Sequence, residues 1–183
     1  MQDLGTLGGD NSYALGINDA GQIVGAADPP PGNKLYAFVW DSSNGMQNLG
    51  LFPGAKQAVA YDINELGEAV GEGEISNNGP SHAVLWDGGS PTDLGTLGGA
   101  TSVAFAINDS SMVVGRSDTG SSETRAFGWD DDGGGAVMTD LNDLLPSGSG
   151  WVLLEAWDVN NSGYITGFGT QNGNVRAFLL HKN

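Results

Sequence analysis

The chain has 183 residues, 22 of them acidic and 6 basic, which gives a formal net charge of -16. Such a negative field repels phosphate backbones and anionic lipid headgroups, so nucleic acid and acidic membranes are not expected partners. The sequence contains no cysteine, which excludes disulfides, thiolate metal sites and cysteine nucleophiles.

Sorting signals are equally sparse. There is no apolar run of about 18 residues, so membrane insertion is not expected. The opening residues MQDLG lack both the basic and the apolar region of a signal peptide. These features predict either a cytoplasmic protein or a mature or excised portion of a longer one.

The first predicted elements follow the heptamer DLGTLGG, which occurs at residues 3–9 and again at 93–99. An identical heptamer at two places indicates internal repetition. In the first repeat, short β-branched or aromatic runs bounded by turn residues predict strands over 12–17, 22–26, 36–40 and 46–49. The NDAG segment at 18–21 predicts a tight hairpin in which Asn or Gly adopts positive φ.

Three sequence blocks recur in the same order along the whole chain. The turn block reads GINDAGQIVG (16–25), DINELGEAVG (62–71), AINDSSMVVG (106–115) and DVNNSGYITG (158–167), so its asparagines are spaced by 46, 44 and 52 residues. The strand block reads YAFVW, HAVLW, RAFGW and RAFLL, and the leading block reads MQDLG, MQNLG, PTDLG and MTDLN. One repeat domain, 1–183, is therefore predicted, with units of approximately 1–45, 46–90, 91–137 and 138–183.

These blocks resemble the HAF-type extracellular repeat, whose His-Ala-Phe triplet is matched most closely by HAV at 82–84. The resemblance covers essentially the whole chain and implies secretion or surface display. It implies no established activity and no catalytic residues.

The unit size and its four strands predict an all-β, four-bladed β-propeller with about 46 residues per blade. Because the chain ends just after a third strand, residues 1–5 are expected to complete the fourth blade and close the ring as a monomer. The alternative is an array whose fourth strand comes from another molecule, which gives a strand-swapped oligomer or a pair of half rings.

Two columns of residues support sheet stacking. Four residues before each turn asparagine lies an alanine, and three before it lies a large residue. Alternation predicts that these columns face opposite sides of one strand, so that small and large faces interlock. A glycine ends the second run of every unit, at Gly25, Gly71, Gly115 and Gly167, which indicates a bulge or a close backbone approach.

A binding site is predicted on the loops that join strand four to strand one and strand two to strand three, since these loops vary most between units. Their aromatic and charged members are Asp10, Tyr36, Phe52, Lys56 and Trp151. Exposed aromatic rings with short polar neighbours could stack on sugar rings or peptide side chains. The alternative is that Phe52 and Trp151 pack over the end of the channel.

Catalytic and metal signals are weak. No G-x-S-x-G pentapeptide is present, and His82 and His181 are the two histidines. Carboxylate pairs for glycoside hydrolysis could come from Glu155 with Asp158 or from the cluster Glu65, Glu68, Glu72 and Glu74. No cofactor is expected, although the oxygen-rich segments 41–45, 129–135 and 18–21 could hold calcium instead of forming simple turns.

The expected function is that of a non-catalytic binding or structural module, secreted or surface-displayed, with a glycan or protein partner. The alternative is a hydrolase of glycans or esters with its site at the mouth of the channel. A third reading is a repeat array whose only property is its fold.

Overall fold

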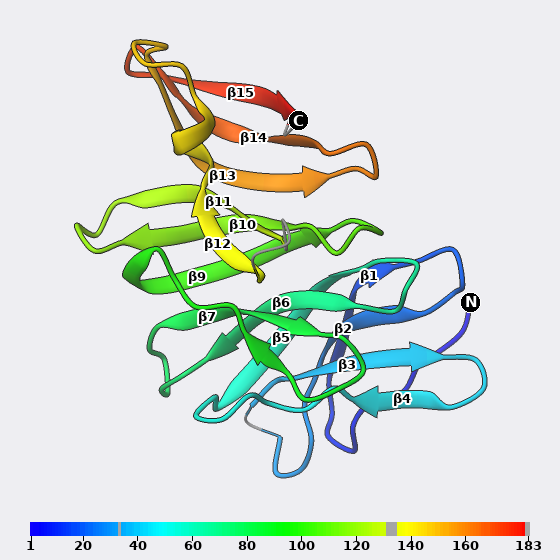
Figure 1. The fold of residues 1–183 in the computed structure, drawn as a ribbon. Coiled ribbons are helices and arrows are strands. Elements are labelled where there is room, and N and C mark those ends of the chain that lie inside the picture. Colours follow the sequence, from blue (N-terminus) through cyan, green and yellow to red (C-terminus); the bar gives the residue numbers. More distant parts are fainter. Residues whose placement is uncertain (33, 131–134, 182–183) are drawn as a thin grey trace.

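A computed structural model describes residues 1–32, 34–130 and 135–181, and its strands form four antiparallel sheets (Figure 1). The first sheet comprises β1 (Ser12–Ile17), β2 (Ile23–Ala27), β3 (Tyr36–Asp41) and β4 (Gly45–Asn48); the second β5 (Gln57–Ile63), β6 (Ala69–Glu74), β7 (Ser81–Trp86) and β8 (Thr92–Asp93). The third comprises β9 (Gly98–Ile107), β10 (Val113–Thr119), β11 (Thr124–Asp130) and β12 (Val137–Asp140); the fourth β13 (Trp151–Val159), β14 (Tyr164–Gln171) and β15 (Asn174–His181). One 3-10 helix, η1 (Leu141–Leu144), precedes β13. The prediction of an all-β fold is confirmed, and the strands predicted for the first repeat match β1 to β4 to within a residue or so.

An asparagine closes the turn between the first two strands of every sheet. The Oδ1 atoms of these asparagines accept the backbone N–H four residues later, at 2.9–3.0 Å, in Asn18, Asn64, Asn108 and Asn160. Positive φ falls three residues after the asparagine, on Gly21, Gly67, Ser111 and Gly163. The predicted hairpin is therefore present, and the asparagine itself has an ordinary φ.

The same asparagines also link the sheets. The Nδ2 atoms of Asn18, Asn64 and Asn108 each donate to the backbone carbonyl of the next asparagine in the series, at 3.0 Å. We call this series, from Asn18 to Asn160, the asparagine ladder. Its hydrogen bonds explain why the turn sequence stays nearly constant from unit to unit.

A β-bulge interrupts the first strand of every sheet at an equivalent position. The register shifts between Ala14 and Gly16, and equivalent shifts surround residues 61, 105 and 157. The bulge brings a carbonyl of the first strand toward the glycine that ends the second run. A Cβ on Gly71, for example, would lie 1.9 Å from the carbonyl oxygen of Val59. The recurrent glycine is therefore required by close backbone approach, as predicted.

Neighbouring sheets pack through small and β-branched side chains. The alanine column confirms the small face, since Ala60, Ala104 and Ala156 are fully buried between sheets. Each meets a buried alanine of the preceding sheet's third strand, as Ala60 meets Ala37. The column of large residues is not buried between the sheets, as predicted packing would require, because Leu15 and Trp157 are exposed and Tyr61 and Phe105 are half-buried. Because its members are the bulged residues, they leave the regular alternation of the strand.

The repeated heptamer adopts the same structure twice. Gly5 and Gly95 have φ of +80° and +75°, and Gly8 and Gly98 have φ of +102° and +97°. In both copies a threonine hydroxyl donates to the carbonyl of the last glycine, from Thr6 to Gly9 at 2.9 Å and from Thr96 to Gly99 at 3.0 Å. The leucines of each heptamer pack on the Phe and Trp of the following strand block, which explains why the heptamer recurs.

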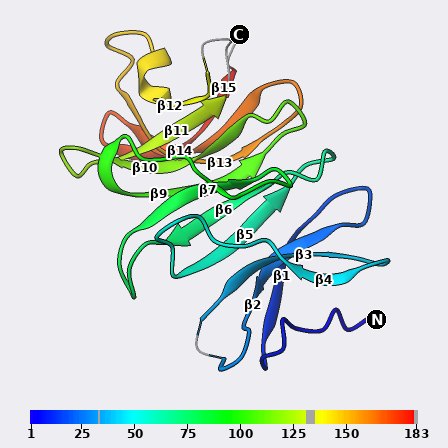
Figure 2. The same ribbon diagram turned by 60° about the horizontal axis from the view of Figure 1, so that its bottom comes forward.

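The predicted closure by residues 1–5 is not present. These residues belong to no strand, and the fourth sheet has three strands within the described residues, with β15 paired to β14. The first and fourth sheets lie at opposite ends of the array (Figures 1 and 2). The repeated blocks specify each sheet locally but contain no information on the angle between sheets, and this angle decides whether the ends meet.

Candidate ligand-binding site

The bulged residues form a row of aromatic rings along the first strands of successive sheets. Tyr61 of β5, Phe105 of β9 and Trp157 of β13 occupy equivalent positions, and we call them the aromatic strip. Ring centroids are 6.2 Å apart between Tyr61 and Phe105 and 5.3 Å apart between Phe105 and Trp157, with the latter pair stacked at 19°. The strands that carry them pack side by side, β5 on β9 and β9 on β13.

The aromatic strip is open to solvent. Trp157 is 55% exposed, and Tyr61 and Phe105 are half-buried. Leu15 holds the same position in β1 and is also exposed, so the apolar row continues toward the first sheet. Because a bulge turns its extra residue out of the ladder, the same backbone feature that requires the glycine also presents these rings.

Polar groups flank the aromatic strip. The Tyr61 hydroxyl donates to Glu72 at 2.6 Å, and Arg116 forms an ion pair with Glu155 at 3.4 Å. Burial, together with the bond to Glu72, raises the pKa of Tyr61 above its ordinary value, so the hydroxyl stays protonated at neutral pH. The strip therefore combines flat apolar rings with hydrogen-bonding groups at its margin.

Asp62 follows the strip residue of the second sheet and connects it to the third. Its Oδ2 accepts the backbone N–H of Ile107 at 2.9 Å. Burial raises the pKa of Asp62, the bond from Ile107 opposes that rise, and the charge of Asp158 adds to it. Asp158 follows the strip residue of the fourth sheet.

The loop residues predicted to bind a ligand are not gathered into one site. Phe52 is buried and packs in the core of the second sheet, beside Gly73. Trp151 is half-buried and packs against the hydrophobic core between the third and fourth sheets, where it lines a pocket of about 190 Å³. Phe52 and Trp151 therefore both pack against the protein, as in the alternative to ligand binding. Asp10 and Lys56 are exposed, and Tyr36 is half-buried.

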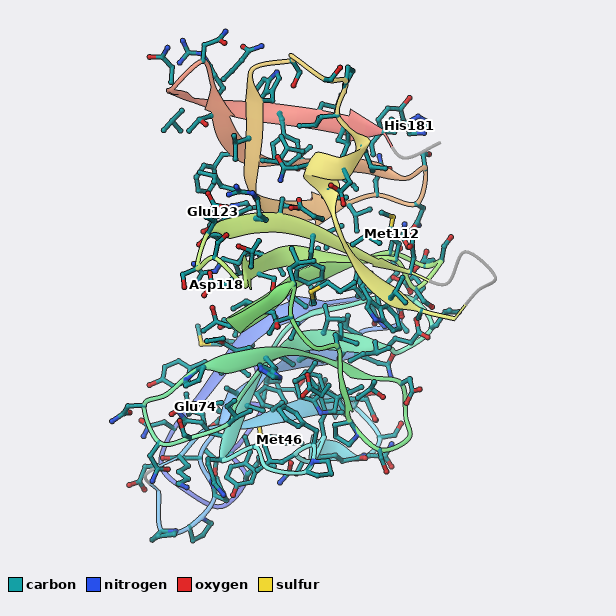
Figure 3. The ribbon with its side chains drawn as sticks, turned by 60° about the vertical axis from the view of Figure 1, so that its left-hand side comes forward. Met46, Glu74, Met112, Asp118, Glu123 and His181 are labelled. Atoms are coloured by element: carbon teal, nitrogen blue, oxygen red, sulfur yellow. The ribbon has the colours of Figure 1, made fainter. Side chains whose placement is uncertain are left out.

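Acidic side chains lie along one edge of the array of sheets. In Figure 3, Glu74, Asp118 and Glu123 lie along the edge formed by the loops between second and third strands, whereas Met112 and His181 lie on the opposite side. Near the first of these edges, an open pocket of about 290 Å³ has Tyr13, Asp28, Lys34 and Gln57 in its lining. The backbone N–H of Asn11, at 2.7 Å, is the main cause that lowers the pKa of Asp28 below its ordinary value.

At the turn edge, a depression of about 360 Å³ is lined by residues of all four asparagine turns. Asp19, Glu65 and Asp109 lie in it. The Glu65 carboxylate accepts from the backbone N–H of Asp19, and the Asp109 carboxylate accepts from the backbone N–H of Glu65 and from the side-chain amide of Asn161. Within the described ranges, no group of three or more His, Cys, Asp or Glu side chains is arranged to hold a metal ion.

The other candidate residues have local partners. Asp41 accepts from the backbone N–H groups of Ser43 and Asn44, so the segment 41–45 forms a hydrogen-bonded turn. Residues 131–134 of the segment 129–135 lie outside the described residues. His82 bonds to Asp93 across β7 and β8 at 2.8 Å, and His181 stacks on Tyr164.

Residues 8–177 match a family model described as "Protein of unknown function (DUF3466)". The chain belongs to the DUF3466 family. Its match spans all four sheets, so the aromatic strip lies within the family's domain. No curated protein matches the DUF3466 chain significantly. Across the described part of this DUF3466 protein, no helix has the length and apolar character needed to cross a bilayer.

Sequence reasoning singled out the column of large residues but assigned it to packing between sheets. The signal that could have placed it correctly was the glycine opposite it. A glycine repeated at one strand position indicates a bulge, and a bulge exposes the residue at its centre.

Proposed function

We propose that the protein is a non-catalytic binding module, secreted or surface-displayed, whose aromatic strip holds an extended neutral glycan. The observation that carries this proposal is the row of three neighbouring rings, with Phe105 stacked on the exposed Trp157 and with Glu72, Arg116 and Glu155 beside the row. Flat rings offer apolar faces to sugar rings, while the flanking groups can bond to hydroxyls. The net charge of -16 disfavours acidic polysaccharides.

This proposal moves the ligand from the variable loops to the first strands of the sheets. The four sheets would act as blades that present these strands around one axis. Support for that arrangement comes from the depression at the turn edge, which residues from all four turns line together.

The test compares two tryptophans of the same strand, β13. Binding of a neutral-glycan panel is measured for the wild type, Trp157→Ala and Trp151→Ala. Loss of the exposed ring should weaken binding at least tenfold, about 1.4 kcal/mol, whereas Trp151→Ala should leave affinity within about twofold. The reverse pattern would favour the loop site, and no binding by the wild type would reject the glycan proposal.

A hydrolase is the second candidate, and the environment of Asp62 is the observation that favours it. A carboxyl whose pKa is raised by burial, with a second acid acting on it, is an arrangement that glycosidases use for acid catalysis. Its test is turnover of glycan and ester panels by the wild type and Asp62→Asn. Loss of turnover in Asp62→Asn would support the hydrolase candidate. Absence of turnover in the wild type would reject it, and the binding function would be the remaining proposal.

A further inference from the structure

The first sheet exposes a face that the other three sheets bury. Ile17 is 66% exposed, whereas its equivalents Ile63, Ile107 and Val159 are 4–5% exposed. Ala14 is likewise exposed, although the three equivalent alanines are fully buried. In the internal interfaces this face packs on the second and third strands of the preceding sheet, as Ala60 and Ile63 pack with Val24 and Ala37.

The fourth sheet exposes the complementary face. Ala177 is exposed, while its equivalents Ala37, Ala83 and Ala126 are fully buried. Leu179 and Val175, two residues to either side on β15, are 67% and 65% exposed. The array therefore ends in the two halves of the interface that it builds three times internally.

The asparagine ladder is unfinished in the same way. Asn160 closes its own turn by accepting from Ser162 and Tyr164. Among the described residues, the Nδ2 of Asn160 makes no bond equivalent to the rung from Asn108 to Asn160, and Asn18 receives no rung from a preceding asparagine. A second copy placed on the fourth sheet would bring the Asn18 carbonyl to Asn160.

Strand pairing gives a third and independent observation. The fourth strands place Asn48, Asp93 and Asp140 opposite Phe38, Val84 and Phe127. Asp3 is the residue equivalent to Asn48, Asp93 and Asp140, but it lies in no strand. Phe178 on β15 is the residue equivalent to Phe38, Val84 and Phe127. Residues 1–3 of one copy thus have the sequence of the strand that would pair with β15 of another.

We propose that two copies of the chain associate head to tail, with the first sheet of one copy packed on the fourth sheet of the other and residues 1–3 paired along β15. A heterologous contact of this kind closes into a ring or continues as a filament, according to the rotation between copies. The occupant is a second copy because both faces repeat an interface already present in the chain, and because the two faces lie at opposite ends of the same molecule (Figures 1 and 2). This inference is independent of the glycan proposal.

The first experiment measures molar mass by light scattering over a range of concentrations. The wild type should reach twice the monomer mass or more. Leu179→Asp should raise the dissociation constant at least tenfold, while Leu66→Asp, on an equally exposed leucine of a turn (67% against 65%), should behave as the wild type. A wild type that stays monomeric at millimolar concentration, or equal effects of both variants, would overturn the proposal.

The second experiment uses the absence of cysteine in the chain. Ala14→Cys and Ala177→Cys are made separately, mixed and oxidised, with Leu66→Cys replacing Ala177→Cys as the control. The first mixture should yield a disulfide-linked product of twice the monomer mass, and the control mixture should yield several-fold less. A third protein carries both Ala14→Cys and Ala177→Cys. A disulfide within one chain of this double variant would indicate ring closure by the monomer and would refute association of copies.

Discussion

Replacing Asn64 by alanine tests whether the asparagine ladder holds neighbouring sheets together. The Asn64 side chain donates to the Asn108 carbonyl at 3.0 Å and to Glu68 at 2.6 Å, and it accepts from the backbone N–H groups of Leu66 and Glu68 at 3.0 and 2.9 Å. A net hydrogen bond contributes about 0.5–1.5 kcal/mol. Loss of this set should lower the free energy of unfolding by about 3 kcal/mol.

Asn160→Ala is the matched control, because Asn160 closes the same kind of turn and, within the described ranges, donates to no further sheet. It accepts two exposed backbone N–H groups, from Ser162 of the turn and from Tyr164 at the start of β14. Its loss should cost about 1 kcal/mol. The difference of about 2 kcal/mol between the two variants is the contribution of the rung, of the bond to Glu68 and of the buried position.

Urea unfolding followed by fluorescence of the five tryptophans measures both variants, at a protein concentration low enough to keep the chain monomeric. For a chain of this length, about 3 kcal/mol corresponds to a melting temperature lower by about 6–12 °C. Equal losses for Asn64→Ala and Asn160→Ala, within about 0.5 kcal/mol, would show that the turn matters and the rung between sheets does not.

Two further predictions concern the bulge and an acidic side chain. Gly71→Ala would place its Cβ 1.9 Å from the Val59 carbonyl oxygen, so it should destabilise the fold by about 3 kcal/mol or more. Gly120→Ala, whose Cβ would meet nothing closer than 3.6 Å, should unfold at nearly the wild-type urea concentration; similar losses would refute the steric explanation. Asp28, bonded by Asn11, has a pKa below its ordinary value of 3.8, so its ionised form stabilises the fold above pH 3.8, and that contribution disappears as pH falls through the lowered folded value. Asp28→Asn should therefore be less stable than the wild type at pH 7 and should converge with it in acid; a constant difference between pH 7 and pH 2 would contradict this.

Local features of the fold were predictable because they depend on neighbouring residues. The turn block contains the asparagine that caps the hairpin and, in three units, the glycine at positive φ. Gly25 and its equivalents indicated a close backbone approach, since glycine destabilises a regular strand and recurs at one strand position only where a side chain would not fit. Strand positions followed from short β-branched runs between these turns.

The candidate site was predicted less well because it depends on the direction in which each side chain points, and not only on the position of the residue in a strand or loop. Phe52 was assigned to a ligand-binding loop, but the loop folds inward and its ring fills space beside Gly73. Trp157 was assigned to packing, but the bulge turns it out to solvent. In both cases residue type and spacing were correct, and the surrounding backbone decided which side the ring faced.

The sequence by itself determined that the chain folds as four units of short antiparallel strands, because strand and turn preferences act over a few residues and are spelled out in each repeat. Tertiary structure alone decided that the aromatic rings line up across sheets, that residues 1–5 do not seal the fourth sheet, and that complementary faces are exposed at the two ends. These outcomes depend on the rotation between packed sheets, which arises from many contacts between residues about 46 positions apart and leaves no short pattern in the sequence.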